Sequence, residues 1–240
     1  MTEVGRIAAL WRYPVKSMAA EALAEGELYW HGLAGDRRWA FIRAGVERSD
    51  FPWLTIRERS DMHHYRPRFL EPERPDDSRT VVRTPSGAEL DVVDPALAAE
   101  LGHGARVLKQ HRGAFDTMPL SLISTRSVAA IGAAVGRELD PLRFRPNLLV
   151  EPADGAAFAE DGWVGAVLRV GEAIMRVDRP DERCAVVNVD PATAERDPAV
   201  LKAIGRERRA RLGVYGSTVR PGRVAVGDPV VLTAAGASGS

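Results

Sequence analysis

The chain has 240 residues, 45 % of them hydrophobic and 28 % charged, an ordinary globular composition with enough residues for a substantial core. Its 33 basic and 33 acidic residues cancel, so no overall field favours nucleic acid or an anionic membrane as a partner. A single cysteine excludes an internal disulfide and a multi-cysteine zinc or iron–sulfur site. With no secretory signal pattern and no hydrophobic run near the ~20 residues that cross a bilayer, we expect a cytoplasmic protein.

The first part of the chain, residues 1–112, is expected to form a domain of short strands. A short helix is predicted over residues 53–64, ending before Pro67, and the turn at 84–88 suits a hairpin. The predicted strands are 6–13, 27–30, 37–42, 80–83, 89–93 and 106–110. Short strands separated by turn signals favour a β-barrel or a strongly bent sheet over a doubly wound α/β layer.

The pattern changes near residue 115, and a second domain is expected over residues 113–233. Ser124 or Thr125 can cap a helix that runs to Val135, and Asp197-Pro198 begins another. The predicted strands are 148–150, 164–170, 173–177, 185–189, 211–219 and 223–232. The small, polar tail 234–240 is expected to be disordered. The predicted fold class is therefore mainly β with a few helices, an α+β arrangement built on a barrel.

Cys184 is the only cysteine, and it lies at a predicted loop-to-strand junction directly after Arg183. A free cysteine often behaves as a small buried hydrophobic residue. The neighbouring arginine instead favours the thiolate, which attacks electrophiles and binds soft metals. Asp181 and Glu182 oppose that effect, so the local charges leave both interpretations open.

Several basic and polar residues stand at predicted strand ends or turns, where they could bind an anion: Lys16-Ser17, Arg37 and Arg145-x-Asn147. Converging on one phosphate, each charge-assisted bond would contribute about 1.5–3 kcal/mol. Scattered as surface ion pairs, each would contribute about 0–1 kcal/mol. Spacing alone does not decide between the two.

Two other groups of residues carry weaker signals. The five histidines lie in turns or on the predicted short helix, and their spacing suggests no metal site. The arginines between residues 206 and 211 are interrupted by one glutamate, a pattern that fits a solvated face or a docking patch for an acidic partner.

Five motifs in chain order resemble those of the MOSC proteins, which are named after the carboxy-terminal domain of molybdenum cofactor sulfurase. The motifs are Tyr13-Pro-Val-Lys-Ser17, Gly35-Asp-Arg37, Arg143-Phe-Arg-Pro-Asn147, Arg183-Cys184 and Pro221-Gly-Arg-Val-Ala-Val-Gly-Asp228. The resemblance covers about residues 5–232. It implies an amino-terminal MOSC-type β-barrel domain over 1–112, followed by the MOSC domain proper over 113–233.

The resemblance also implies a cofactor, molybdopterin bearing a molybdenum ion, and a role for each matching residue. Cys184 would ligate the metal, and Asp116 would either deliver protons or hold a turn. Ser124 and Thr125 would add donors at a helix start. The pterin and its phosphate would be held by Lys16, Ser17, Arg37, Arg145 and Asn147.

The implied activity is reduction of N-hydroxylated or similar N-oxygenated small molecules. Electrons would come from a separate ferredoxin, flavoprotein or cytochrome b5-type protein, and neither a nucleic acid nor a membrane is expected as a partner. The alternatives are a carrier that holds sulfur on Cys184 or transports the cofactor, without a pyridoxal-phosphate domain to generate the sulfur, and a barrel with a packed cysteine. Two departures from the family pattern stand out: Met18-Ala19-Ala20 after the Lys-Ser pair, and Asp181-Glu182, which would disfavour an anionic substrate.

Overall fold

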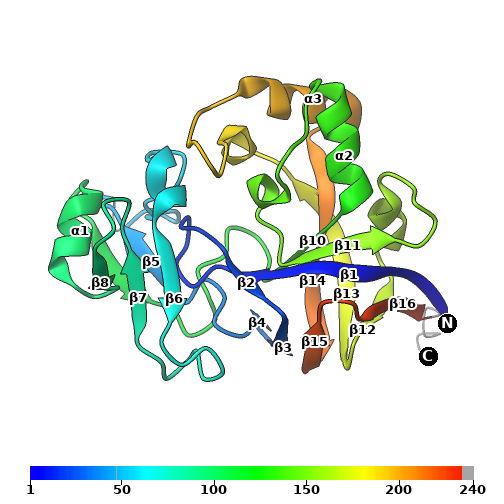
Figure 1. Ribbon diagram of the computed structural model, residues 1–240, viewed down its shortest axis with the longest axis horizontal. Helices are drawn as coiled ribbons and strands as arrows, with labels where there is room; N and C mark the ends of the chain where they lie inside the picture. Colours follow the sequence, from blue (N-terminus) through cyan, green and yellow to red (C-terminus); the bar gives the residue numbers. More distant parts are fainter. Residues whose placement is uncertain (47, 234–240) are drawn as a thin grey trace.

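The computed structural model describes residues 1–46 and 48–233, and within them the chain forms sixteen strands, three α-helices and four 3-10 helices (Figure 1). The strands are β1 (Thr2–Arg12), β2 (Glu21–Leu23), β3 (Glu25–Tyr29), β4 (Gly32–Leu33), β5 (Trp39–Ile42), β6 (Arg66–Phe69), β7 (Thr80–Arg83), β8 (Glu89–Asp91), β9 (Arg106–Lys109), β10 (Leu120–Ser124), β11 (Leu148–Pro152), β12 (Val167–Val170), β13 (Ala173–Glu182), β14 (Arg211–Arg220), β15 (Gly222–Ala225) and β16 (Pro229–Thr233). The helices are α1 (Pro95–Leu101), α2 (Thr125–Ala134) and α3 (Pro198–Arg208), with 3-10 helices η1 (Ser60–His64), η2 (Pro141–Phe144), η3 (Ala159–Trp163) and η4 (Ala185–Asn188). The predicted class, mainly β with a few helices, is confirmed.

The largest sheet closes on itself as a barrel. Its strands follow the order β11-β10-β14-β13-β12-β16-β1, and β1 pairs again with β11, which completes the ring, while β2 extends β1. The β10–β11 pair is parallel and the other pairs are antiparallel. Side chains such as Leu122, Val150 and Leu168 are fully buried inside. The barrel interior is therefore a packed core, and a ligand site has to lie outside it.

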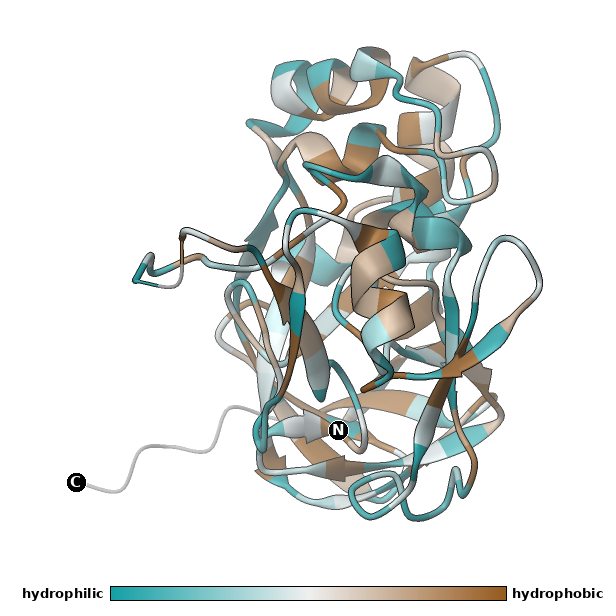
Figure 2. Ribbon diagram, turned by 90° about the vertical axis from the view of Figure 1, so that its left-hand side faces the viewer, coloured by the Kyte–Doolittle hydropathy of each residue, from teal (hydrophilic) through white to brown (hydrophobic). Residues whose placement is uncertain are grey.

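A second lobe is built from two small sheets, β5–β9 and β6–β7–β8, together with α1 (Figure 1). Its core contains Phe41, Met62, Tyr65 and Leu97. Strand β6 alternates exposed and buried residues, as a sheet with one solvated face should, and hydrophilic and hydrophobic residues alternate along the ribbon of this lobe (Figure 2). Helices α2 and α3 lie together over one end of the barrel and bury a third cluster (Figure 1).

The two halves of the chain are interleaved. Strand β1, from the predicted domain 1–112, pairs with β11 and β16 of the barrel, and β15 pairs with β3. The division into 1–112 and 113–233 remains a prediction, and the predicted disordered tail 234–240 lies outside the described residues.

The predicted helix at 53–64 is wrong. Only Ser60–His64 is helical, as a 3-10 turn. Leu54 and Ile56 are buried, and the backbone N–H of Leu54 donates to the carbonyl of Phe41, so this segment runs extended along the edge of β5. Tertiary packing here overrides the local pattern.

The predicted strand at 185–189 is also wrong. The strand in this region is β13, which lies before Cys184 and ends at Glu182. The residues after the cysteine form the 3-10 helix η4. Five of the strands and α-helices were not predicted: β2, β4, β6, β10 and α1. Helix α1 carried a readable signal, since Asp94 accepts a hydrogen bond from the backbone N–H of Ala96 and Pro95 takes the first helical position.

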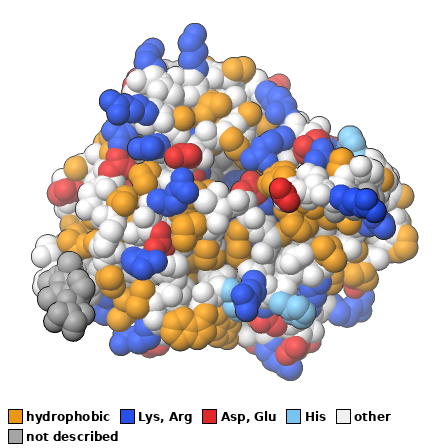
Figure 3. All heavy atoms as spheres, turned by 180° about the vertical axis from the view of Figure 1, so that it is seen from behind, with side chains coloured by type: hydrophobic (Ala, Val, Ile, Leu, Met, Phe, Trp, Pro, Cys, Tyr) orange, Lys and Arg blue, Asp and Glu red, His pale blue; other side chains and the backbone are white. Residues whose placement is uncertain are grey.

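The surface has no large region of one charge sign on the face shown in Figure 3, where basic side chains are interspersed with acidic and hydrophobic ones. Among the described residues, no helix is both long and hydrophobic enough to cross a bilayer.

Candidate functional site

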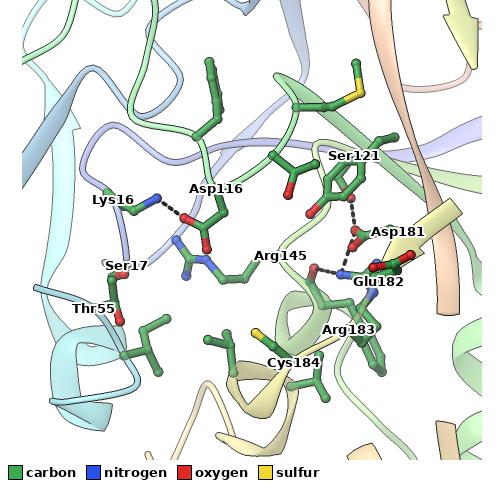
Figure 4. A pocket seen from close by; sticks show the side chains of 18 of the residues that line it. Lys16, Ser17, Thr55, Asp116, Ser121, Arg145, Asp181, Glu182, Arg183 and Cys184 are labelled. Carbon is green, nitrogen blue, oxygen red and sulfur yellow. Dashed lines mark hydrogen bonds and ion pairs between the residues drawn. The ribbon is translucent and has the colours of Figure 1, made fainter. Parts of the chain in front are cut away.

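A cavity lies where the second lobe meets the end of the barrel, and most of the predicted site residues line it (Figure 4). They come from five separate segments of the chain. These residues therefore converge in space, which their spacing in the sequence could not establish. The predicted residues that line it are Lys16, Ser17, Arg37, Asp116, Arg145, Asn147 and Cys184. The cavity also contains Arg57, which the sequence analysis did not single out.

Three of these residues have left-handed backbone conformations. Ser17, Arg37 and Arg145 have φ values of 70°, 50° and 53°. Non-glycine residues seldom adopt this region, and each such conformation costs about 1–3 kcal/mol when the surrounding structure enforces it. The coincidence of three at one cavity is the pattern expected of a binding site.

Tyr13 contacts both Arg37 and Arg145 and so holds these two side chains in place. The Arg37 and Arg145 guanidinium groups contact its ring, at 4.6 Å and 4.2 Å from the centroid. Its hydroxyl donates to the carbonyl of Pro146 at 3.1 Å, and burial raises its pKa. The buried Asp36 carboxylate accepts from the Tyr13 backbone N–H at 2.7 Å and pairs with Arg37.

Arg145 is the cation with the most unused donor capacity. Its guanidinium makes no hydrogen bond or ion pair within the described residues, and Nη2 is fully buried. Burial lowers the pKa of Arg145 to about 10. A buried donor without an acceptor is costly, so this group is suited to receive an anionic ligand.

Lys16 is buried, and its ammonium donates to the carbonyl of Ala114 at 2.7 Å and pairs with Asp116. Burial lowers the pKa of Lys16 to about 8, although the adjacent carboxylate acts in the opposite direction. The ammonium is therefore charged at neutral pH, and it loses its proton about two pH units earlier than a solvated lysine does.

We expect an NMR titration of the Lys16 side chain in the cofactor-free protein to show a midpoint near pH 8. Asp116→Asn should move that midpoint lower, because a carboxylate that stabilises the ammonium is lost. Between this midpoint and the usual lysine value the unfolded chain binds more protons, so this residue makes the free energy of unfolding rise with pH there. A midpoint at the ordinary lysine value would contradict the described burial.

Cys184 is exposed, and its Sγ faces the cavity (Figure 4). Arg57 Nη2 lies 3.2 Å from this sulfur and 3.3 Å from Asp116 Oδ2. Arg196 holds the Arg57 turn in place by donating to the carbonyls of Ile56 and Arg57, each at 2.9 Å. The cation in contact with the sulfur is therefore Arg57.

Arg183, which was expected to favour the thiolate, makes its side-chain contacts elsewhere. Its guanidinium donates to the carbonyls of Leu212 and Phe144 and pairs with Asp181, so it is committed to the barrel end. Asp181 is itself buried, which raises its pKa, and its charge is compensated by Arg183. The pair of negative charges expected beside the sulfur is thus reduced to the exposed Glu182.

Asp116 lies between Lys16 and Arg57. Burial alone would raise the pKa of Asp116, but these two cations lower it below its usual value. The carboxylate is therefore ionised at neutral pH, which suits a counter-ion. Proton delivery by Asp116 stays an untested prediction.

Asn147 lines the cavity but uses its side-chain amide elsewhere. Oδ1 accepts from the Ser121 backbone N–H at 3.2 Å, and Nδ2 donates to the Trp11 carbonyl at 3.1 Å. The residue joins β10 to the end of β1, so it shapes the cavity wall.

Ser124 and Thr125 do not line the cavity, and their expected role as anion donors is corrected. Ser124 is fully buried as the N-cap of α2, where its side chain accepts from the Ser127 backbone N–H. Its own backbone N–H donates to Glu160 at 3.1 Å, and the Thr125 hydroxyl bonds Glu151. Carboxylates of the chain itself already occupy these donors.

Comparison with family models divides the chain in two. Residues 4–118 match the MOSC N-terminal beta barrel domain, and residues 108–231 match the MOSC domain. The chain is 26 % identical to the molybdenum cofactor sulfurase of Drosophila grimshawi, over 92 % of this chain and 34 % of that protein. It thus spans about a third of the length of that relative.

Two further similarities cover most of both chains. The chain is 24 % identical to human mitochondrial amidoxime-reducing component 1, over 97 % of this chain and 84 % of that protein. The solved structure of the YUAD protein from Bacillus subtilis matches 95 % of this chain and 94 % of its own, with a TM-score of 0.51 and 14 % identity. The latter similarity bears on the fold alone.

Proposed function

The chain belongs to the MOSC family, and from this premise we propose that it is a molybdenum-cofactor-dependent reductase of N-hydroxylated compounds. The observation that carries the proposal is the shared cavity of Cys184 and the unpartnered Arg145 guanidinium. A soft sulfur ligand and a cationic anion site in one cavity suit a ligand that has a metal at one end and a phosphate at the other.

The donor set supports a metal that arrives with its own ligands. Within the described part of the chain, no group of three or more histidine, cysteine or acidic residues could hold a metal ion. Cys184 therefore offers one sulfur and leaves the remaining coordination positions to the cofactor, whose dithiolene would supply two more sulfur atoms. When bound, the group would supply two-electron chemistry at molybdenum.

The chain's own contribution would be to bind and orient the cofactor. Cys184 would ligate the metal, while Lys16, Arg37 and Arg145 would hold the anionic part, with Ser17 as a hydroxyl partner. The cavity measures about 110 Å³, and within its lining Asp116 pairs with both Lys16 and Arg57. An anionic ligand would compete with Asp116 for these two cations, so binding is expected to displace this carboxylate.

Reduction also needs an electron source. The 240 residues contain one cysteine, too few for a four-cysteine iron–sulfur cluster. We propose a separate ferredoxin, flavoprotein or cytochrome b5-type protein as the donor, and a cytoplasmic location for the reaction. The small-molecule substrate would meet Cys184 and Arg57 at the exposed end of the cavity.

The direct test is an assay of the cofactor-loaded protein with an amidoxime and a chemical reductant that needs no partner protein. The proposal predicts that the amidine forms, and that the reductant gives up two electrons for each amidine molecule produced. Loaded protein that binds molybdenum yet forms no amidine, while an established molybdenum reductase does so under the same conditions, would contradict it.

A second candidate, a carrier without turnover, is favoured by the similarity to a third of a molybdenum cofactor sulfurase and by the exposure of Cys184. Mass spectrometry of the intact protein under non-reducing conditions distinguishes the two. An additional sulfur atom on Cys184, removed by a thiol reductant, would support the carrier.

A further inference from the structure

A second cavity, of about 300 Å³, shares Arg145 with the Cys184 cavity. Both halves of the chain contribute to it: Tyr13, His63 and Arg66 from one, and Asp140, Leu142 and Arg145 from the other. None of the roles considered above uses this space. Tyr13 lines this cavity and not the proposed cofactor site.

Three polar side chains that line this cavity have no hydrogen-bond acceptor or ion-pair partner among the described residues. His63 is 5 % exposed, and its Nε2 is buried with no hydrogen-bond partner within the described residues. The Arg145 guanidinium has no acceptor in the same part of the chain, and the exposed Arg66 makes no hydrogen bond or ion pair there. Buried polar groups are normally satisfied, so the unpartnered His63 Nε2 and Arg145 Nη2 indicate a missing partner, and the solvated Arg66 is free to join it.

The chemistry of these groups defines what that partner is. Two guanidinium groups supply only donors. Burial, reinforced by the charge of Arg145, lowers the pKa of His63 to about 3, so the ring is neutral and also offers one N–H. Asp140 is the one carboxylate in the lining, and it accepts from the Leu142 backbone N–H at 2.8 Å, so it does not pair with either arginine.

The rest of the lining is apolar and fixed. Ala19 and Ala20 form one side, where the Ala19 backbone N–H donates to the carbonyl of Tyr65 at 3.0 Å. Pro191 and Ala192 form the other, where Asp190 accepts from the Ala192 N–H at 2.9 Å. The short side chains at positions 19 and 20 leave this side of the cavity open.

We propose that this cavity is a second binding site, for a small oxyanion such as a phosphate or a carboxylate, held by Arg66, Arg145 and His63. The apolar walls would contact the organic part of such a ligand. Arg145 lines both cavities, so the two proposed sites share this residue, and His63 and Arg66 belong to the second cavity alone.

The test uses the cofactor-free full chain, with inorganic phosphate and acetate as probes and the His63 ring resonances as the NMR readout. At least one anion should shift these resonances saturably, with a dissociation constant on the order of millimolar. Arg66→Ala should weaken that binding by about tenfold or more, because one charge-assisted bond is lost. No saturable shift with either anion would overturn the proposal.

Two control variants make the result specific. Arg68→Ala removes the same charge from the same face of β6, but Arg68 does not line the cavity and pairs with Glu89. It should bind the probe with wild-type affinity, and an equal loss in Arg66→Ala and Arg68→Ala would overturn the proposal. Lys16→Ala alters only the Cys184 cavity, so loss of the His63 response in this variant would place the anion there instead and would also overturn it.

Discussion

Cys184→Ser is expected to abolish the proposed amidoxime reduction, with a loss of more than about 100-fold in kcat/KM. Changes to residues that only support a metal ligand already cost about 10–100-fold, and this change removes the ligand itself. Serine oxygen is a hard donor that does not replace a thiolate at a soft, sulfur-rich metal site. The measurement is the steady-state rate with a chemical reductant, normalised to the amount of folded protein.

The fold itself should tolerate this substitution. The Cys184 side chain is exposed and its sulfur accepts from Arg57 alone, so the free energy of unfolding should change by about 0.5 kcal/mol or less. Ala185→Ser is the matched control, since Ala185 is the exposed neighbour and does not line the cavity. It should keep wild-type activity. If Cys184→Ser retained activity, the Cys184 sulfur would not be required for the proposed reaction.

Asp36→Ala is expected to destabilise the protein by about 3–5 kcal/mol, the typical cost of breaking a buried ion pair by removing one partner. The Asp36 carboxylate is fully buried, and it both pairs with Arg37 and accepts from the Tyr13 backbone N–H. Its loss leaves an uncompensated guanidinium and an unsatisfied N–H beneath the cavity. Urea unfolding measures the effect as a lower midpoint at unchanged slope.

Glu89→Ala is the comparison for this prediction. Glu89 pairs with Arg68 at 3.2 Å, but both side chains are about half exposed. Such surface pairs contribute about 0–1 kcal/mol, so this variant should unfold close to the wild type. Equal destabilisation by the two substitutions would show that burial of Asp36 is not what makes its ion pair important.

Much of the fold could be predicted because its signals are local. Strand β7 alternates between more and less buried residues and is separated from β8 by a turn, and α3 begins at Asp197-Pro198, where the carboxylate caps the helix as expected. The closure of the ring could not be predicted in the same way. It depends on β1 pairing with β11, about 140 residues away, and with β16, more than 220 residues away, and no local pattern encodes that pairing.

The candidate site, like the fold, could be predicted only where the signal was local. Lys16, Arg37, Arg145 and Cys184 were predicted because they lie in motifs, and the structure brings them to one cavity. Arg57 was missed because it lies in a segment predicted as a helix, and only tertiary contacts turn it toward the sulfur.

Ser124 and Thr125 were predicted from a sound local signal, since Ser124 does cap α2. A helix start can bind an anion, but here Glu160 and Glu151 take those donors. The capping pattern identifies where a helix begins and gives no information about which anion it meets.

The central claim is that Cys184 holds the metal of a cofactor bound in this cavity. Elemental analysis for molybdenum and tungsten, on wild-type and Cys184→Ser protein purified from cells that make the cofactor, tests it most directly. We predict about one metal atom per wild-type chain and a several-fold lower content in the variant. Wild-type protein without either metal, or equal metal content in both proteins, would contradict the claim.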